Sequence, residues 1–262
     1  MSDFVVDKIL KRGSGIPFAI ISLISSLAFP IGYSLIYILG YYTNTGSKDY
    51  TNLGNDLSAQ LLADSQFILM SQLLLWVGLL TGVTFAALRG HYTMPNGKNM
   101  FALGFRPIWL LIGLGLGLLI QGVVLGLGWL LQGAFGEETV AGNGQQILDT
   151  LGSMPPVLLF FMLAVIAPIV EEIAYRGLIF TAFARKFGLM AGGIISSVLF
   201  GFAHVQSFNL NGIFLLLITM SLGGILAYAR HKSGGLTLPI MIHIAFNSVS
   251  ASALLALDYI PQ

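Results

Sequence analysis

Long apolar stretches dominate this sequence and limit what it can fold into. Seven occur, at residues 16–40, 67–88, 107–135, 156–183, 189–205, 213–229 and 236–257. A helix needs about 20 apolar residues to cross a membrane. Only 9% of the chain is charged, against about 25% in soluble domains, so a water-facing surface cannot be covered. The sequence therefore excludes a soluble globular fold and predicts an all-α polytopic membrane protein.

We expect a single transmembrane domain over residues 1–262, a bundle of seven helices. The stretch at 189–205 is short for a span, so it must tilt or thin the bilayer locally. An eighth helix fits only as a short or re-entrant one, because a further span would break the charge alternation described next.

Basic residues alternate between the predicted loops. The N-terminal tail and every second loop hold most of them: Lys8, Lys11, Arg12, Arg89, Lys98, Arg106, Arg185, Lys186, Arg230 and Lys232. The opposite loops and the C-terminal end hold one base, Lys48, and the acids Asp49, Asp56, Asp64, Glu137, Glu138, Asp149 and Asp258. The positive-inside rule then predicts a multi-pass cell-membrane protein with its N-terminus in the cytoplasm and its C-terminus outside.

The net charge and the lack of cysteine exclude several kinds of partner and site. A net charge of +1 argues against nucleic acid, which favours a basic protein surface. The chain has no cysteine, which excludes disulfides, thiolate metal sites and cysteine nucleophiles. Membrane lipid and a peptide or protein substrate remain as partners, and the oligomeric state stays open.

Two glycine pairs lie in the third stretch, Gly113 with Gly117 and Gly122 with Gly126. Such GxxxG spacing lets helix backbones approach closely. We expect these glycines to serve packing within the bundle, with a dimer face as the alternative.

Three charges interrupt the fourth apolar stretch: Glu171, Glu172 and Arg176. Each costs about 2.5–3.5 kcal/mol at the centre of a membrane helix. Glu172 and Arg176 are four residues apart, so they can form an ion pair on one helix face. Glu171 lies about 100° around the helix and has no local partner. A carboxylate left unpaired in an apolar helix is a candidate general base or acid.

Further polar residues interrupt two later stretches. His204 lies four residues after Phe200, and Asn247 lies four residues after His243, so each pair shares a helix face. Glu171 could activate a water, with the histidines and Asn247 holding that water or stabilising an oxyanion. Alternatively, Glu171, His204 and His243 could bind a divalent metal such as zinc. No HExxH, GxSxG or phosphate-binding glycine loop occurs.

The motifs EExxxR at residues 171–176, FxxxH at 200–204 and HxxxN at 243–247 follow one another in this order. In this the sequence resembles the CPBP (CAAX protease and bacteriocin-processing, or Abi) family of intramembrane proteases, which is related to the type II CAAX prenyl endopeptidases. The similarity covers a catalytic core at about residues 154–250.

The resemblance implies a helical bundle with a water-filled cavity open to the cytoplasmic side. It implies that Glu171 activates water, assisted by His204, His243 and Asn247, while Glu172 and Arg176 support the site together with Phe200. Both metal-dependent and metal-free mechanisms are associated with the family. We favour the metal-free one, because an asparagine suits an oxyanion hole better than a metal. Peptide processing or bacteriocin self-immunity would be the biological setting.

Two other classes of function compete with an endopeptidase. A proton-coupled transporter would use the Glu and His side chains as a relay across the membrane. A non-catalytic immunity or scaffold protein would keep the fold alone. The arrangement of the side chains separates the first two, since a protease needs them around one point and a relay needs them strung out.

Overall fold

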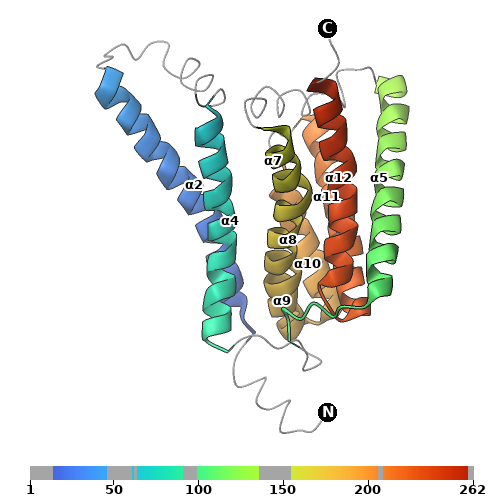
Figure 1. Ribbon diagram of the computed structural model, residues 1–262. Helices are drawn as coiled ribbons and strands as arrows, with labels where there is room; N and C mark the ends of the chain where they lie inside the picture. The colour runs from blue at the N-terminus through green and yellow to red at the C-terminus, as the bar shows by residue number, and fades with distance from the viewer. Residues whose placement is uncertain are drawn as a thin grey trace.

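The computed structural model describes residues 14–45, 61, 64–90, 99–135, 155–205 and 209–258, and the long elements among them are all helices. Six are α2 (Ile16–Thr45), α4 (Ser65–Leu88), α5 (Pro107–Phe135), α10 (Leu189–Phe202), α11 (Leu210–Ser233) and α12 (Thr237–Asp258). A seventh, broken helix joins α7 (Pro156–Phe161), η2 (Met162–Ile166), α8 (Ala167–Glu171), η3 (Glu172–Ile179) and α9 (Phe180–Phe187), where η marks π-helix. The predicted all-α fold is confirmed, and all seven stretches are helical (Figure 1).

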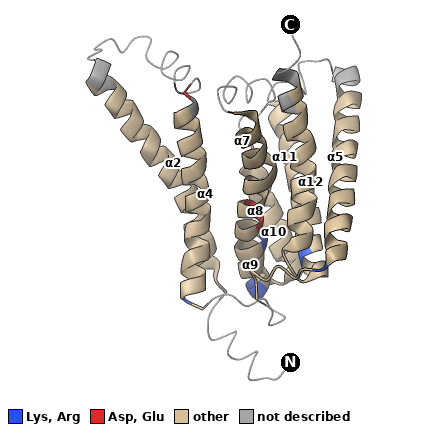
Figure 2. Ribbon diagram, viewed as in Figure 1, with Lys and Arg blue, Asp and Glu red and all other residues tan. Residues whose placement is uncertain are grey.

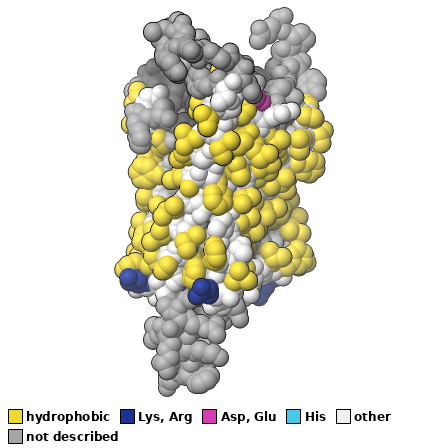
Figure 3. Space-filling view, turned by 90° about the vertical axis from the view of Figure 1, so that its left-hand side faces the viewer, with side chains coloured by type: hydrophobic (Ala, Val, Ile, Leu, Met, Phe, Trp, Pro, Cys, Tyr) yellow, Lys and Arg dark blue, Asp and Glu magenta, His cyan; other side chains and the backbone are white. Residues whose placement is uncertain are grey.

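The helices have the length and composition of membrane spans. Within the described residues, α2, α4, α5, the broken helix and α11 are each long and apolar enough to cross a membrane. The 22 residues of α12 extend for about 33 Å, whereas α10 has 14 residues and extends for about 21 Å. Hydrophobic side chains cover the face seen in Figure 3 between its two ends. The chain is a multi-pass membrane protein, and α10 is the short helix that the sequence predicted.

Most of the basic side chains among the described residues gather at one end of the bundle (Figure 2). The end where α4 finishes and α5 begins, called the basic end below, carries Arg89, Arg106, Arg185, Lys186 and Lys232. Asp64 lies at the opposite end, at the start of α4. Many of the charges used for the topology prediction lie outside the described residues: Lys8, Lys11, Arg12, Lys48, Asp49, Asp56, Lys98, Glu137, Glu138 and Asp149.

Glycines allow two helix pairs to pack closely. In the pair α2 and α4, a Cβ atom on Gly82 would lie 2.0 Å from the Phe18 carbonyl oxygen. In the pair α5 and α12, a Cβ atom on Gly117 would lie 2.3 Å from the Ile242 carbonyl oxygen. The packing role predicted for Gly113 and Gly117 is therefore confirmed.

The second glycine pair of α5 differs. Cβ atoms on Gly122 and Gly126 would meet nothing within 4 Å. The packing role predicted for this pair is wrong among the described residues. Gly122 lies five residues after Gly117, about 140° around the helix, so this pair is on an exposed face of α5 and not on the face that meets α12.

The central helix is not a regular α-helix, and Pro168 supplies a physical reason. Proline has no N–H and its ring clashes with the carbonyl four residues earlier. The helix widens before it, so that the Ala167 N–H donates to the Met162 carbonyl, five residues back. A second π segment, η3, begins at Glu172 and carries Arg176. The regular α-helix predicted for this stretch is therefore wrong at residues 162–166 and 172–179.

Arg230 is another correction. It was expected in a loop, but it lies in α11 and its side chain is fully buried. Its Nη2 donates to the Met100 carbonyl at 2.7 Å. The segment around Met100 also joins the α11–α12 turn through hydrogen bonds from Leu236 N to Ala102 O and from Thr237 N to Leu103 O. This segment therefore packs under the bundle at the basic end, where it covers Arg230.

Candidate active site

Glu172 and Arg176 form a fully buried ion pair at the centre of the bundle. Arg176 Nη1 lies 2.8 Å from Glu172 Oε1, and neither side chain is exposed. Arg176 Nη2 also donates to the Gly223 carbonyl of α11 at 3.3 Å. The predicted contact is confirmed, and the second bond ties the broken helix to α11.

Phe200 packs against Arg176 of the ion pair and against both histidines. The Arg176 guanidinium carbon is 4.4 Å from the centre of its ring, a cation–π distance. The His204 and His243 rings lie 4.5 and 5.6 Å from the same centre. The phenylalanine of the FxxxH motif therefore packs against the arginine and both imidazoles.

His243 lies between the two glutamates. Its Nδ1 is 3.1 Å from Glu172 Oε1, and its Nε2 is 3.8 Å from Glu171 Oε2. Glu172 is already an acceptor for Arg176, so Nδ1 of His243 carries a hydrogen and donates it. The neutral ring then presents the Nε2 lone pair to Glu171, and a protonated ring presents an N–H there.

His204 approaches Glu171 from another direction. Its Nδ1 lies 2.7 Å from the Phe200 carbonyl oxygen, which can only accept, so Nδ1 donates. Its Nε2 lies 4.0 Å from Glu171 Oε2. His204 is 32% exposed and Glu171 is 15% exposed, whereas His243 is 2% exposed. Molecules from outside the bundle would therefore meet the cluster on the side of His204.

Asn247 has a different partner from the one expected. Its Nδ2 donates to the Leu163 carbonyl at 2.9 Å. In the π register of η2, that carbonyl would accept from the N–H of residue 168, which is proline and has none. Asn247 therefore satisfies a carbonyl that Pro168 leaves free, and one N–H of its amide remains for another acceptor. The sequence shows a proline three residues before Glu171, but it gives no sign that Asn247 bonds to the carbonyl that this proline leaves free.

Glu171 Oε2 is the oxygen on which the cluster converges. It is buried and has no hydrogen-bond partner in the part of the chain that the structure describes. The two His–Glu distances of 3.8 and 4.0 Å exceed a direct hydrogen bond. The two imidazoles therefore approach this oxygen without bonding to it directly.

The same three atoms are a donor set known for zinc. Ligands of a tetrahedral zinc lie about 3.3 Å from one another, given bonds of about 2.0–2.2 Å. Both His–Glu distances are longer than this, and no group of three His, Asp or Glu side chains in the described ranges has metal-site spacing. The residues as placed do not fit a zinc ion.

Comparisons with known proteins place the C-terminal part of the chain. Residues 153–249 match the family model "Type II CAAX prenyl endopeptidase Rce1-like". A Bacillus subtilis (strain 168) protein named "Putative membrane peptidase YdiL" is 31% identical over 156 residues, which are 60% of this chain and 59% of that protein. An Escherichia coli protein named "Uncharacterized 24.3 kDa protein" is 35% identical over 96 residues, 35% of this chain and 42% of its own. No solved structure matches.

The chain thus spans little more than half the length of the first of these relatives and less than half of the second. The matched region contains the EExxxR, FxxxH and HxxxN motifs. The resemblance drawn from those motifs is confirmed: residues 153–249 match the type II CAAX prenyl endopeptidase Rce1-like family, and the relative that is 31% identical is named as a membrane peptidase.

Proposed function

We propose that the protein is an intramembrane endopeptidase in which Glu171 activates the attacking water. One observation carries the proposal: a buried carboxylate oxygen without a partner faces the Nε2 atoms of two histidines from other helices, at 3.8 and 4.0 Å. A general base must reach its proton directly or through one water. A water between Glu171 and either imidazole would meet that requirement.

The reaction balances with these residues alone. Glu171 takes a proton from the water as the water oxygen bonds to the scissile carbonyl carbon. The carbonyl oxygen becomes an oxyanion, which a protonated His243 or His204 stabilises by donating from Nε2. Glu171 then gives its proton to the leaving nitrogen as the C–N bond breaks.

Glu172 and Arg176 have a supporting role in this proposal. Glu172 accepts from Arg176 and from His243, so it holds the His243 ring in the orientation that faces Glu171. Asn247 holds the broken helix through Leu163, and its second N–H is the additional oxyanion donor.

The clustering of these side chains supports a protease over a proton relay. A relay needs titratable groups spaced across the membrane. Here both histidines approach one carboxylate oxygen to within 4.0 Å. The substrate class that we propose is a membrane-associated protein or peptide, in keeping with the peptidase names among the relatives. A role in peptide processing or bacteriocin self-immunity is part of the same proposal.

Comparison of peptide termini in membranes tests this function. Cells that express the wild type or the isosteric Glu171→Gln variant would be compared for new N-termini of membrane proteins, with Asp64→Asn as a control carboxylate outside the cluster. General-base catalysis contributes about 10²–10⁴-fold, so we expect termini that depend on the protein to fall by that factor in Glu171→Gln and to persist in the control. Termini that are identical in the wild type and Glu171→Gln would refute the proposal.

The products identified in this way allow the mechanism to be examined. With a substrate peptide in proteoliposomes, the variants Glu171→Gln, His204→Gln and His243→Gln should each lose activity, and the triple variant should lose little more. Chelator treatment should leave the wild type active if Glu171 acts without a metal. Loss that zinc restores would instead assign Glu171, His204 and His243 to a metal.

A further inference from the structure

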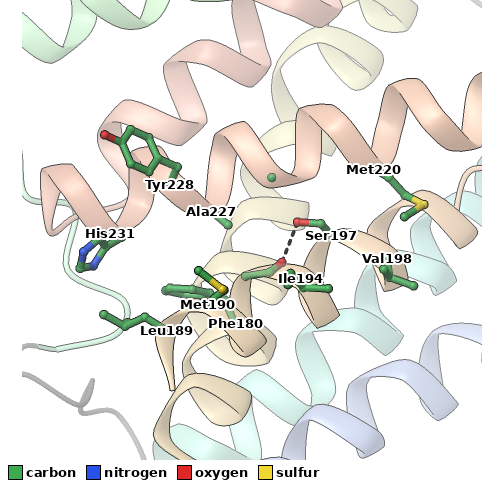
Figure 4. Close-up of a pocket in the computed structure, with 12 residues that line it drawn as sticks. Phe180, Leu189, Met190, Ile194, Ser197, Val198, Met220, Ala227, Tyr228 and His231 are labelled. Atoms are coloured by element: carbon green, nitrogen blue, oxygen red, sulfur yellow. Dashed lines mark hydrogen bonds between the residues drawn. The ribbon is translucent and has the colours of Figure 1, made fainter. Parts of the chain in front are cut away.

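A separate cavity of about 540 Å³ lies between α10 and α11. Its walls come from Phe180 at the start of α9, the first three turns of α10 and the facing side of α11 (Figure 4). None of Glu171, His204, His243 or Asn247 lines it. We call it the α10–α11 groove.

The α10–α11 groove exists because small residues face each other across it. A Cβ atom on Gly193 would lie 3.9 Å from Ala227, and one on Gly224 would lie 3.9 Å from Ser197, so neither position is tightly packed. The adjacent glycines are packed: a Cβ on Gly192 would lie 2.7 Å from Ala184 of α9, and one on Gly223 would lie 3.0 Å from Ser197 of α10. On α11, Gly223 thus packs closely against α10, whereas the neighbouring Gly224 lies further from it.

The floor of the α10–α11 groove is apolar. Ser197 donates its hydroxyl to the Gly193 carbonyl of its own helix at 2.7 Å, so this polar group is satisfied (Figure 4). Met190 and Met220 lie toward opposite ends of the groove. Methionine adapts to irregular apolar ligands. A flexible hydrocarbon would therefore be accommodated along the groove.

One end of the groove is cationic and the other is not. Tyr228 and His231 lie at the basic end, and the Lys232 ammonium is 5.4 Å from the Tyr228 ring centre. Lys186, in the last turn of α9, is separated from the groove residue Leu189 by two residues. In the described part of the chain, the acids are Asp64 at the far end, Glu171 and Glu172 inside the bundle, and Asp258 at the end of α12. No acid among them offsets the positive charge at the groove.

We propose that the α10–α11 groove binds an anionic phospholipid. One acyl chain lies over Gly193 and Gly224, and the phosphate lies among His231, Lys232 and Lys186. An amphipathic ligand with an anionic headgroup matches the α10–α11 groove, which is apolar along its length and has lysines at its end near the membrane surface. A neutral apolar helix would fill the α10–α11 groove but would not pair with the charges of Lys186 and Lys232.

Native mass spectrometry of the full chain, after reconstitution with defined lipids, tests this site. The probes are phosphatidylglycerol and phosphatidylcholine with the same acyl chains. We expect the wild type to retain one phosphatidylglycerol and little phosphatidylcholine. Gly193→Leu and Gly224→Leu place a side chain in the groove and should abolish the retention. Gly122→Leu, on the open face of α5, is the matched control and should retain the lipid.

The charged end is tested separately. A basic residue near a membrane surface contributes about 1 kcal/mol to binding of anionic lipid. Lys232→Gln and Lys186→Gln should therefore each lower retention of phosphatidylglycerol about fivefold, whereas Arg106→Gln should not. Equal retention in the wild type and both leucine variants would overturn the proposal, as would equal retention of the two lipids by the wild type. Neither readout depends on proteolysis.

Discussion

Arg176 contacts three helices at once. It pairs with Glu172 of its own helix, donates to Gly223 of α11 and lies over the Phe200 ring of α10. These partners offset part of its cost of burial, since its Nε is buried without a hydrogen-bond partner among the described residues. Removal of one partner from a buried ion pair costs about 3–5 kcal/mol, since the other charge is left uncompensated.

Arg176→Ala should therefore lower both the folded yield and the free energy of unfolding, the latter by about 3–5 kcal/mol. Denaturation of the detergent-purified protein, followed by circular dichroism, measures this loss. Arg106→Ala, at an exposed position of the basic end, is the control and should change stability by less than about 0.5 kcal/mol. An Arg176→Ala protein as stable as the control would contradict the role given to the ion pair.

At the scale of elements, the broken helix depends on a contact from α12. Asn247 donates to the Leu163 carbonyl that Pro168 leaves without its helical donor. The cost of an unsatisfied buried acceptor is about 1–3 kcal/mol. The two positions should therefore be coupled, although neither side chain needs to touch the other.

A double-mutant cycle tests that coupling. Asn247→Ala should cost about 1–3 kcal/mol in the free energy of unfolding, and less in a Pro168→Ala background, because residue 168 then has an N–H for Leu163. Ser248→Ala, which removes a hydroxyl bonded to its own helix at Ile244, is the control and should show the same small cost in both backgrounds. Equal costs of Asn247→Ala with and without Pro168 would refute the coupling.

The start of α4 contains the second element-scale contact. Asp64 accepts from the backbone N–H groups of Gln66 and Phe67 and from the Tyr37 hydroxyl of α2. The Tyr37 hydrogen bond, followed by that of Phe67, lowers the pKa of Asp64 from its ordinary value of 3.8. A carboxyl whose pKa is lower in the folded state stabilises the fold above its unfolded pKa and loses that effect as pH falls through the folded one.

Stability of the α2–α4 pair should accordingly decrease as the pH falls below 3.8. Unfolding measured across this range should show a shallower decrease for Asp64→Asn, because asparagine still caps the helix but does not titrate. The contribution is modest, since Asp64 is only partly buried. Parallel pH profiles for the two proteins would contradict it.

At the scale of the whole molecule, α2 and α12 run in the same direction, from the basic end to the opposite end (Figure 1). The chain enters α2 at the basic end and leaves α12 at the other (Figure 1). If the basic end faces the cytoplasm, the N-terminus lies inside and the C-terminus outside.

Reporter fusions test this orientation directly. A reporter fused after residue 98 should be cytoplasmic, and reporters fused after residues 50 and 143 should be external. All three positions lie outside the described residues, so the fusions examine connections that the structure leaves open. A cytoplasmic reporter after residue 143 would show that the helix count or the orientation is wrong.

The sequence by itself determined the class of the fold. Apolar runs separated by charged segments predict spans without reference to any contact, because each helix satisfies its own backbone in the membrane. All seven stretches are helices, and the third matches residue for residue. Local spacing also predicted the Glu172–Arg176 pair, since the two residues share one helix.

The tertiary structure alone decided which groups meet between helices. The link of His243 to Glu172 joins residues 71 positions apart, and that of Asn247 to Leu163 joins residues 84 apart. Arg230 resembled a loop residue because charge suggested solvent, yet it is buried under the segment around Met100. Helical periodicity shows which face of a helix is polar, but the partner of that face depends on how the helices pack. The α10–α11 groove also depends on how the helices pack, because Gly223 meets α10 closely whereas Gly193 and Gly224 do not have such close contacts.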